Sequence, residues 1–471
     1  MKKFKIFILS LASSFAAFGA DLDVSSGQLE GLLADEAIKK ESSLRLRGTI
    51  DARDLAALEN LPASVKSLDL SEVRIASLTM PTRKIFGRTL FAEGEIPAYT
   101  FFKAPVEQLI LPADVSAIGE GAFAGSSIAE ITIPEGVTQL GDYAFYGCPN
   151  LKRVTLPRSL KAMGKGAFGN CTALESADLS ATAVTAIPEK AFAGAVALSA
   201  VNLPAGLETI GREAFSHTAV KTLDLSGVRS FEAYALSSMP FLTSLSINPD
   251  AEIGDGLLMD DISLASLTGL PEFVPDYFAA NCAGLDASAA AEASTLGRYS
   301  FANTSAPQEM ILAGFIEKID RGAFSGLTNL AKIDATALED RVPLVDEFSF
   351  EGLPQQQIEL WVSDESFSLW DGHPVWGLFR VMSANQTGVD TIAPDADSSI
   401  GIFCRGGLLI VESPERISDV RVYTTDGRMA YVASPDSERV EIDAASLPSG
   451  VLVVAASDAA GNARTISLIM K

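Results

Sequence analysis

A residue pattern with a period of about 22 runs through more than half of this 471-residue chain. A Phe, or a Leu in its place, recurs with 20 to 26 residues between successive members. The members are Phe101, Phe123, Phe145, Phe168, Phe192, Phe215, Leu236, Leu258, Phe278, Phe301, Phe324 and Phe350. One such repeat cannot bury its own apolar face, so neighbouring repeats must stack and cover it. The period therefore predicts a solenoid with one large apolar side chain plugged into each coil.

Other positions recur in phase with the Phe. Another apolar side chain stands five residues before most members, and a Gly often follows it, as in Ile118-Gly119. About a dozen residues before the Phe lies a short alternating strand such as "VTL" at 154–156, commonly ended by Pro. Pro lacks a backbone N–H and so marks a strand end. The pattern predicts a mostly β protein with short helical or irregular segments, built as a leucine-rich-repeat solenoid of about twelve coils.

The stretch "LKRVTLPRSLKAMGKGAFGNCTAL" (151–174) resembles the BspA-type leucine-rich repeat of bacterial surface and secreted proteins. The resemblance covers roughly residues 90–365. It implies a non-catalytic surface or secreted protein, and adhesion, in some members to host extracellular-matrix proteins or to other bacteria. The repeats at 230–300 are degenerate, with Leu replacing Phe and alanines at 285–294, so we expect a weaker, bent segment there.

The flanking segments divide the chain further. Residues 1–20 have the Lys-rich start, apolar stretch and small residues of a signal peptide. We expect an N-terminal cap at 21–89, repeats with a Trp-rich C-terminal cap at 90–383, and a polar linker at 384–398. Alternating strands with a turn at Asp426-Gly427 predict a small β-sandwich at 399–471. Through "VRVYTTDGR", "LPSGVLVV" and the terminal Lys471 it resembles the sorting domain of type IX secretion cargo.

The composition restricts the partners. The formal net charge is −24, and removing the signal peptide would make it more negative. Such a field repels phosphate backbones and anionic lipid, which argues against nucleic-acid or membrane-surface binding. No later apolar stretch is long enough to span a bilayer. We therefore expect an extracytoplasmic protein, secreted or exposed on the outer surface, and a monomer.

Four cysteines are too few and too scattered for a disulfide framework. Cys148 and Cys171 occupy equivalent positions in adjacent coils, where stacking puts their Cα atoms roughly 5 Å apart. Parallel inward side chains rarely aim at each other, so two free buried thiols are favoured over a disulfide, and a metal site is the least favoured.

Sequence motifs of catalysis are missing around the two histidines. His217 lies in a predicted loop after Phe215, and His373 stands in the C-terminal cap beside Asp371. Neither has a nucleophile elbow, a zinc motif or a phosphate-binding loop near it. We expect no enzyme activity, no cofactor and no metal, and a structural role for His373.

The outward side chains of the strands are the best binding candidates, because alternate residues of a strand face away from the core. The candidate partner-binding positions are Thr132, Thr155, Asp178, Asn202, Asp224, Ser246, Asp334 and Trp361. Ile110 and Ile311 are further outward apolar positions. Carboxylates alternating with an amide favour solvated polar filler, and a partner or cation site is the alternative.

Two functional hypotheses follow. The first is a non-catalytic protein that binds a host or bacterial surface protein or glycoprotein through the solenoid face. The alternative is a structural envelope spacer without a specific ligand.

Overall fold

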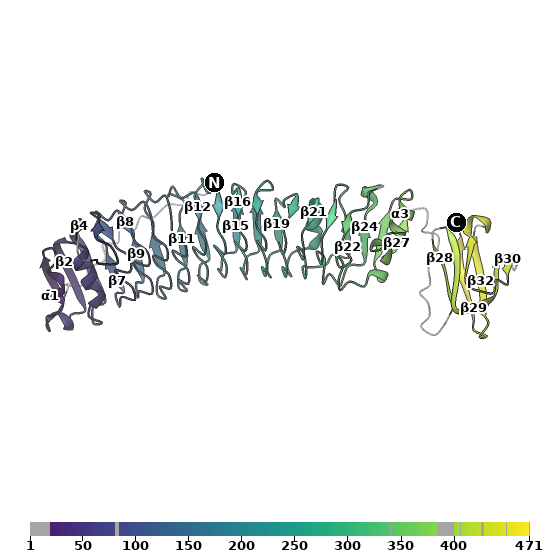
Figure 1. Cartoon of the computed structure of the whole chain (residues 1–471), viewed down its shortest axis with the longest axis horizontal. Coiled ribbons are helices and arrows are strands. Elements are labelled where there is room, and N and C mark those ends of the chain that lie inside the picture. Colours follow the sequence, from purple (N-terminus) through teal and green to yellow (C-terminus); the bar gives the residue numbers. More distant parts are fainter. Residues whose placement is uncertain are drawn as a thin grey trace, which may run out of the picture. The chain divides into compact units, whose positions relative to one another are not determined.

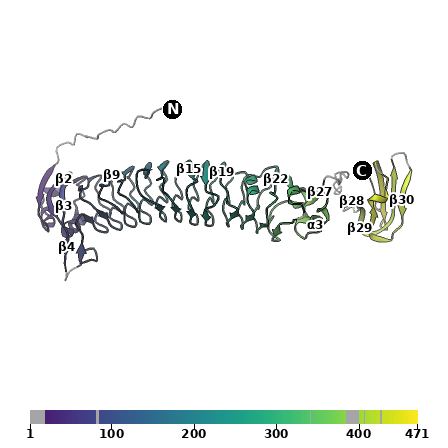
Figure 2. The ribbon, with the colours of Figure 1, turned by 90° about the horizontal axis from the view of Figure 1, so that it is seen from above.

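The computed structural model describes residues 19–80, 84–339, 341–383, 400–405, 407–424, 428–448 and 450–470 (Figures 1 and 2). The predicted signal peptide, the linker at 384–398 and the turn at Asp426-Gly427 lie wholly or almost wholly outside these ranges. The chain divides into two compact units. The first comprises residues up to Asp286 with Tyr299–Ser305, and the second comprises Ala287–Arg298 with the residues from Ala306 onward.

The first unit begins with a parallel sheet and short helices. Strands β1 (Ala20–Val24), β2 (Ser43–Ile50) and β3 (Ser67–Ile75) pair in order, with helix α1 (Leu29–Leu33) between β1 and β2. Asp51 is the N-cap of helix α2 (Ala52–Ala57), and its side chain forms a capping box with Asp54. The remaining elements here are β4 (Leu78–Thr79), β5 (Leu90–Phe91), and the 3-10 turns Ile38–Lys40 and Leu58–Asn60.

Two series of short parallel strands follow, one strand of each series from most coils (Figure 1). The longer strands are β7 (Gln108–Ile110), β9 (Glu130–Thr132), β10 (Arg153–Thr155), β11 (Ser176–Asp178), β13 (Ala200–Asn202), β15 (Thr222–Leu225), β17 (Ser244–Ile247) and β19 (Ser266–Thr268). The two-residue strands are β6 (Glu95–Ile96), β8 (Ala117–Ile118), β12 (Ala186–Ile187), β14 (Thr209–Ile210), β16 (Ser230–Phe231), β18 (Glu252–Ile253) and β20 (Phe273–Val274). Among the described strands of the first series, hydrogen-bonded pairing is interrupted between β13 and β15.

The recurrent Phe residues form the core of this unit, as predicted. From Phe101 to Phe215 each ring is almost completely buried and stacks on the next, with centroids 4.8–5.7 Å apart and planes within 16° of parallel. Burial of one such side chain contributes about 1.5–3 kcal/mol, so the column is a main source of cohesion. The predicted repeat solenoid and mostly β character are confirmed, whereas the number of coils stays a prediction.

The prediction that Phe278 belongs to the column of recurrent Phe and Leu side chains is wrong. Leu258 N–H donates to the carbonyl of Phe278, as Phe145 N–H donates to that of Ala167, so Phe278 occupies the Ala position of its coil. Ala279 stands where the plug was expected, and the ring of Phe278 is tilted by 53° against Phe301. Both residues are buried, so the swap keeps the apolar volume inside while it breaks the ring stack.

The second unit starts in the alanine-rich repeat that the sequence marks as weak. A 3-10 helix, η3 (Ala287–Glu292), is followed by further parallel strands. These are β21 (Thr295–Leu296), β22 (Glu309–Ile311), β23 (Lys318–Ile319), β24 (Lys332–Asp334), β25 (Leu344–Val345), β26 (Glu359–Val362) and β27 (Arg380–Ser383). Helix α3 (Phe367–Asp371) and 3-10 turns at Thr336–Leu338, Gln355–Gln357 and Trp376–Leu378 complete the repeats. Trp370 and Trp376 are fully buried and meet edge to face, 5.1 Å between centroids.

The C-terminal residues form one six-stranded antiparallel sheet. Its strands are β28 (Gly401–Arg405), β29 (Leu408–Thr424), β30 (Met429–Ala433), β31 (Ser437–Asp443), β32 (Gly450–Asp458) and β33 (Ala463–Met470), with a 3-10 turn at Ala444–Ser446. The first part of β29 pairs with β28 and β31, and its second part pairs mainly with β30 and β32. Side chains from both parts, including Val411 and Val420, join one buried apolar cluster. The predicted sandwich stays a prediction.

Candidate functional site

Six predicted binding residues form one row in the first unit, which we call the outer row. Its members are Thr132, Thr155, Asp178, Asn202, Asp224 and Ser246. All are exposed except the half-buried Ser246. The register places Thr132 opposite Thr155, Asp178 opposite Asn202, and Asp224 opposite Ser246. Thr268, which sequence reasoning missed, extends the row, and its hydroxyl donates to Ser246 Oγ at 2.9 Å.

The aspartates of the row also serve the turn that follows each strand. Asp178 Oδ1 accepts from the Ser180 N–H at 3.0 Å and from its hydroxyl at 2.7 Å, and Asp224 does the same with Ser226. These are Asx turns closed by a Ser two residues on. The Ser180 hydroxyl, helped by its N–H and by Asn202, lowers the pKa of Asp178, and Ser226 lowers the pKa of Asp224. Both carboxylates are therefore ionised and oriented at neutral pH.

A second outward column borders the outer row. Glu130 and Arg153, opposite each other on β9 and β10, form an ion pair at 2.7 Å. Sequence reasoning missed this column because it considered only the outward residue that follows the buried apolar residue at the centre of each strand. The residue that precedes this apolar residue faces the same side. Exposed pairs of this kind add little to stability, so the pair mainly sets the local charge pattern.

The second unit carries the other two predicted residues. Ile311, Asp334 and Trp361 lie in register on β22, β24 and β26. Lys332 Nζ lies 2.6 Å from Glu309, 3.6 Å from Asp334 and 5.1 Å from the centroid of the Trp361 ring. Asp334 is half-buried and accepts from Thr336 in the same kind of turn as the outer-row aspartates. Ile311 is exposed by 58%.

Three of the four cysteines belong to the coil interior, and Cys404 lies in β28. Cys148 and Cys171 are free, fully buried thiols, and each donates to the carbonyl of the Phe in the preceding coil, Phe123 and Phe145, at 3.0 Å. Cys282 does the same with Leu258 at 2.9 Å. The neighbouring Cys148 thiol and burial raise the pKa of Cys171. The thiol is thus a small apolar side chain that also satisfies a buried carbonyl.

Asp261 occupies this interior position in one coil. It is fully buried, and its Oδ1 accepts from the Met239 N–H at 2.6 Å. Its Oδ2 is buried without a hydrogen-bond partner among the described residues. Burial, with a smaller contribution from the Asp260 charge, raises the pKa of Asp261 well above its usual range. The group is therefore a neutral acid in the folded coil at a pH where exposed carboxyls are charged.

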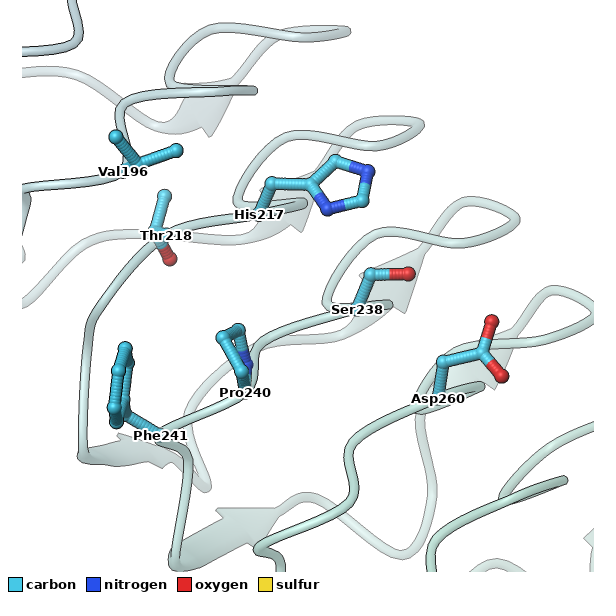
Figure 3. A pocket seen from close by; sticks show the side chains of 7 residues that line it. All are labelled: Val196, His217, Thr218, Ser238, Pro240, Phe241 and Asp260. Atoms are coloured by element: carbon cyan, nitrogen blue, oxygen red, sulfur yellow. The ribbon is translucent and has the colours of Figure 1, made fainter.

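A hollow of about 320 Å³ opens on the surface of the first unit, and we call it the slot (Figure 3). Its apolar side is formed by Val196, Pro240 and Phe241. Its other lining residues are His217, Thr218, Ser238 and Asp260. His217, Ser238 and Asp260 have positive φ values of 57–68° and come from three successive coils. Their side chains extend to the same side in Figure 3. Sequence reasoning missed the slot and placed only His217, in a loop.

Backbone N–H groups hold the His373 side chain in place. Its Nδ1 accepts from the N–H groups of Val375 and Trp376, each at 3.2 Å, and burial lowers its pKa. Within the described ranges, no three His, Cys, Asp or Glu side chains gather in a way that could hold a metal ion. The same ranges contain no helix with the length and apolarity that crossing a bilayer requires.

The model of the BspA type leucine rich repeat region matches residues 94–192, 179–286 and 294–367, more than half of the chain. The chain belongs to the BspA type leucine-rich-repeat family. The repeats matched include all outer-row residues and the slot. No relative among curated proteins matches this BspA type leucine-rich-repeat protein.

One solved structure shares the fold, and further solved structures are similar at lower TM-scores. A leucine-rich repeat protein from Bacteroides ovatus is 21% identical, covers 77% of this chain and 87% of its own, and has a TM-score of 0.53. The pneumococcal vaccine antigen PcpA is 15% identical over 74% of this chain and 81% of its own, with a TM-score of 0.36. A leucine rich cell surface protein from Faecalibacterium prausnitzii is 19% identical over 54% and 86%, with a TM-score of 0.26.

Proposed function

We propose that this BspA type leucine-rich-repeat protein is a secreted or cell-surface binding protein without catalytic activity. It holds a host or bacterial surface protein or glycoprotein through the outer row and its neighbours. The observation that carries the proposal is the row of mostly exposed polar side chains of the first unit, which is in register from β9 to β13 and again from β15 to β17. Parallel strands repeat at about 4.8 Å, so the row presents evenly spaced hydrogen-bonding groups to an extended partner surface.

Binding of the full mature chain to a panel of host glycoproteins, glycans and bacterial surfaces tests the proposal. The variant Thr155→Arg with Asn202→Arg places two bulky cations in the outer row. The matched control, Thr172→Arg with Asn150→Arg, makes the same exchanges at exposed positions outside the strands. We expect saturable binding that the first variant lowers at least tenfold and the control leaves unchanged. Absence of saturable binding, or equal loss in both variants, contradicts the proposal.

A structural envelope spacer is the second candidate function, and the aspartate turns favour it. Asp178, Asp224 and Asp334 each use a carboxylate oxygen to close their own Asx turn, which gives these residues a structural reason to be present. A spacer tolerates Asp178→Ala with Asp224→Ala in function and is lost when the Trp-rich closing residues are removed. In a binding protein, Asp178→Ala with Asp224→Ala should lower function more than removal of the Trp-rich closing residues does.

The C-terminal sheet is proposed to direct export to the surface. The proposal is supported by the resemblance of "VRVYTTDGR" and "LPSGVLVV" to type IX sorting domains. Deleting residues 399–471 is expected to leave the protein inside the outer envelope, as measured by protease accessibility on intact cells. Unchanged surface exposure of the truncated chain would refute this role.

A further inference from the structure

Two exposed pairs of aromatic side chains lie in turns of the first unit, and we call them the aromatic corners. One corner consists of Tyr99 and Phe102, and the other consists of Tyr143 and Tyr146. The two rings meet edge to face in both, with centroids 6.0 Å apart in the first corner and 5.6 Å apart in the second. All four side chains are exposed by 40–47%. Each corner therefore offers apolar ring surface in two perpendicular planes.

The two corners are built in the same way, because they occupy the same place in their coils. In each, the N–H of the second aromatic residue donates to the carbonyl of the first, at 3.1 Å and 3.0 Å. The ring of Tyr99 comes within 2.5 Å of the point where Gly121 would carry a Cβ, and the ring of Tyr143 comes within 2.7 Å of that point at Gly166. Both Tyr rings thus lean over the next coil, so the two corners have the same orientation.

The coil between the corners leaves the path from one corner to the other open. Its two equivalent positions hold Gly121, which has no side chain, and Ala124, which is buried. The core rings of these coils are 5.1 Å apart from Phe101 to Phe123 and 4.8 Å apart from Phe123 to Phe145. The corners, which are two coils apart, therefore repeat after about 10 Å.

A polyproline II helix fits this spacing. It has three residues per turn and rises about 3.1 Å per residue, so equivalent residues recur about every 9.3 Å. Prolines three residues apart can therefore meet one corner each, and such segments typically dock against aromatic side chains. The Tyr146 hydroxyl accepts from Asn170 Nδ2 at 2.6 Å, which leaves its own proton to be donated. A carbonyl of a polyproline II helix can accept it, because this helix forms no internal hydrogen bonds.

The charges beside the corners favour a partner with a basic residue. Glu120 and Asp142 occupy equivalent positions in successive coils, and both are exposed. The Tyr99 hydroxyl donates to Glu120, so this carboxylate lies at the edge of the first corner. Lys103 Nζ lies 5.1 Å from the centroid of the Phe102 ring, which places a cation on the other side of that corner. Two carboxylates on the Tyr side and a net charge of −24 therefore favour a basic residue next to the prolines.

We propose that the aromatic corners bind a proline-rich segment of a protein partner in the polyproline II conformation. Prolines three residues apart pack into the two corners, and a basic residue beside them lies toward Glu120 and Asp142. The inference rests on the proposed function in that the partner is a protein. It assigns a second contact surface, since the corners lie in turns and the outer row lies on strands.

Two blocked peptides of the same composition test the spacing on the full mature chain. One is Arg-Pro-Ala-Ala-Pro-Ala-Ala-Pro, with prolines three residues apart, and the other is Arg-Pro-Pro-Pro-Ala-Ala-Ala-Ala. In calorimetric titrations we expect saturable binding of the first peptide in the micromolar to millimolar range, and at least about fivefold weaker binding of the second. Equal binding of the two peptides, no binding of either, or tighter binding of the glucan oligosaccharide cellohexaose would overturn the inference.

Variants locate the contact surface. Tyr143→Ala with Tyr146→Ala removes one corner and is expected to weaken binding of the spaced peptide at least about fivefold. The matched control is Phe273→Ala with Tyr277→Ala, which removes two side chains that are exposed by 65% and 38% elsewhere in the first unit. This control should bind the peptide like the parent chain. Equal loss of binding in the two variants would contradict binding at the corners.

Two further variants test the charge and separate the two surfaces. Glu120→Gln with Asp142→Asn is expected to weaken binding of the spaced peptide about twofold to threefold. The outer-row variant, Thr155→Arg with Asn202→Arg, should bind this peptide as tightly as the parent chain, whatever its effect on the glycoprotein panel. Failure of the corners is thus distinguished from failure of the outer row, and loss of peptide binding in the outer-row variant would overturn the inference.

Discussion

At the scale of single residues, one interior position explains why cysteine recurs in the repeat. Cys148, Cys171 and Cys282 fill it with a small side chain that donates to a carbonyl of the preceding coil. Thr218 and Thr304 instead donate to the Phe carbonyl of their own coil. A disulfide between Cys148 and Cys171 would remove both thiol donors, which is a physical reason for the free thiols seen here.

Asp261 makes the stability of the first unit pH-dependent. Its folded-state pKa is raised above the ordinary value of 3.8, so the stabilisation is complete below about pH 3.8 and is lost as pH rises through the folded-state pKa. Asp260 and Cys282 are the titratable groups that face it. At neutral pH we expect the free energy of unfolding of Asp261→Asn, measured by urea titration, to exceed that of the parent chain by about 1–3 kcal/mol. This difference should shrink toward pH 4.

That measurement is a difference between two chains, so the other carboxylates cancel. Parallel stability curves of the parent and Asp261→Asn from pH 4 to pH 8 would contradict the assignment of a neutral buried acid. Asp260→Asn, at the half-buried neighbour, is the matched control and should leave most of the pH dependence in place.

Phe168 is expected to be one of the most sensitive core positions. Its ring is fully buried and stacks on Phe145 at 5.3 Å and on Phe192 at 5.7 Å. Phe168→Ala should lower the free energy of unfolding by about 3–5 kcal/mol, because it removes buried area and leaves a cavity between two rings. Thr155→Ala, on an exposed strand position, is expected to stay within about 0.5 kcal/mol in the same urea titration. Similar effects of the two changes would show that the ring column is not the core.

At the scale of the coil, backbone-to-backbone approach decides which glycines are required. A Cβ on Gly141 would lie 2.5 Å from the backbone carbon of Gly119, and one on Gly164 would lie 2.3 Å from the backbone nitrogen of Asp142. These glycines sit where each coil turns against the coil before it. Their recurrence in the sequence therefore reports close stacking and not a phosphate-binding loop.

Gly141→Ala is expected to destabilise the first unit by about 1–3 kcal/mol, because two coils must move apart to admit the methyl group. Gly206→Ala is the control, since a Cβ there meets no atom within 4 Å. Thermal unfolding followed by circular dichroism compares the two. A larger loss of stability in Gly206→Ala than in Gly141→Ala would contradict the close approach.

The repeat made much of the coil predictable, since burying one face of every coil forces apolar residues to recur. The strands around "VTL" and the inward Phe rings follow directly from that periodicity. The swap of Phe278 and Ala279 was not predictable from apolar spacing, because both orders bury the same residues. Asp261 was missed since an Asp-Asp pair in sequence resembles a solvated surface. The slot depends on a one-residue difference in loop length, which only a coil-by-coil comparison of Gly194, His217 and Ser238 displays.

At the scale of the whole molecule, protection against hydrogen exchange should vary along the repeats. The coils from Phe123 to Phe215 have a continuous stack of rings, whereas Leu236, Leu258 and Ala279 occupy the same position in the coils that follow. Smaller plugs bury less area, so these coils should open locally at lower free energy. Mass-spectrometric exchange is expected to be slower in 123–215 than in 236–285. Uniform protection over both ranges would contradict a stability gradient.

Most described coils pair with their neighbours through parallel, in-register strands, as in the match of Ser176–Asp178 with Ala200–Asn202. Duplicating or losing one whole period in the underlying gene keeps every inward residue inward and every outward residue outward. Loss of a single residue is absorbed within one loop, as at His217. Proteins of this design can therefore change length during evolution by whole periods. Small deletions within a loop can in addition create new surface features.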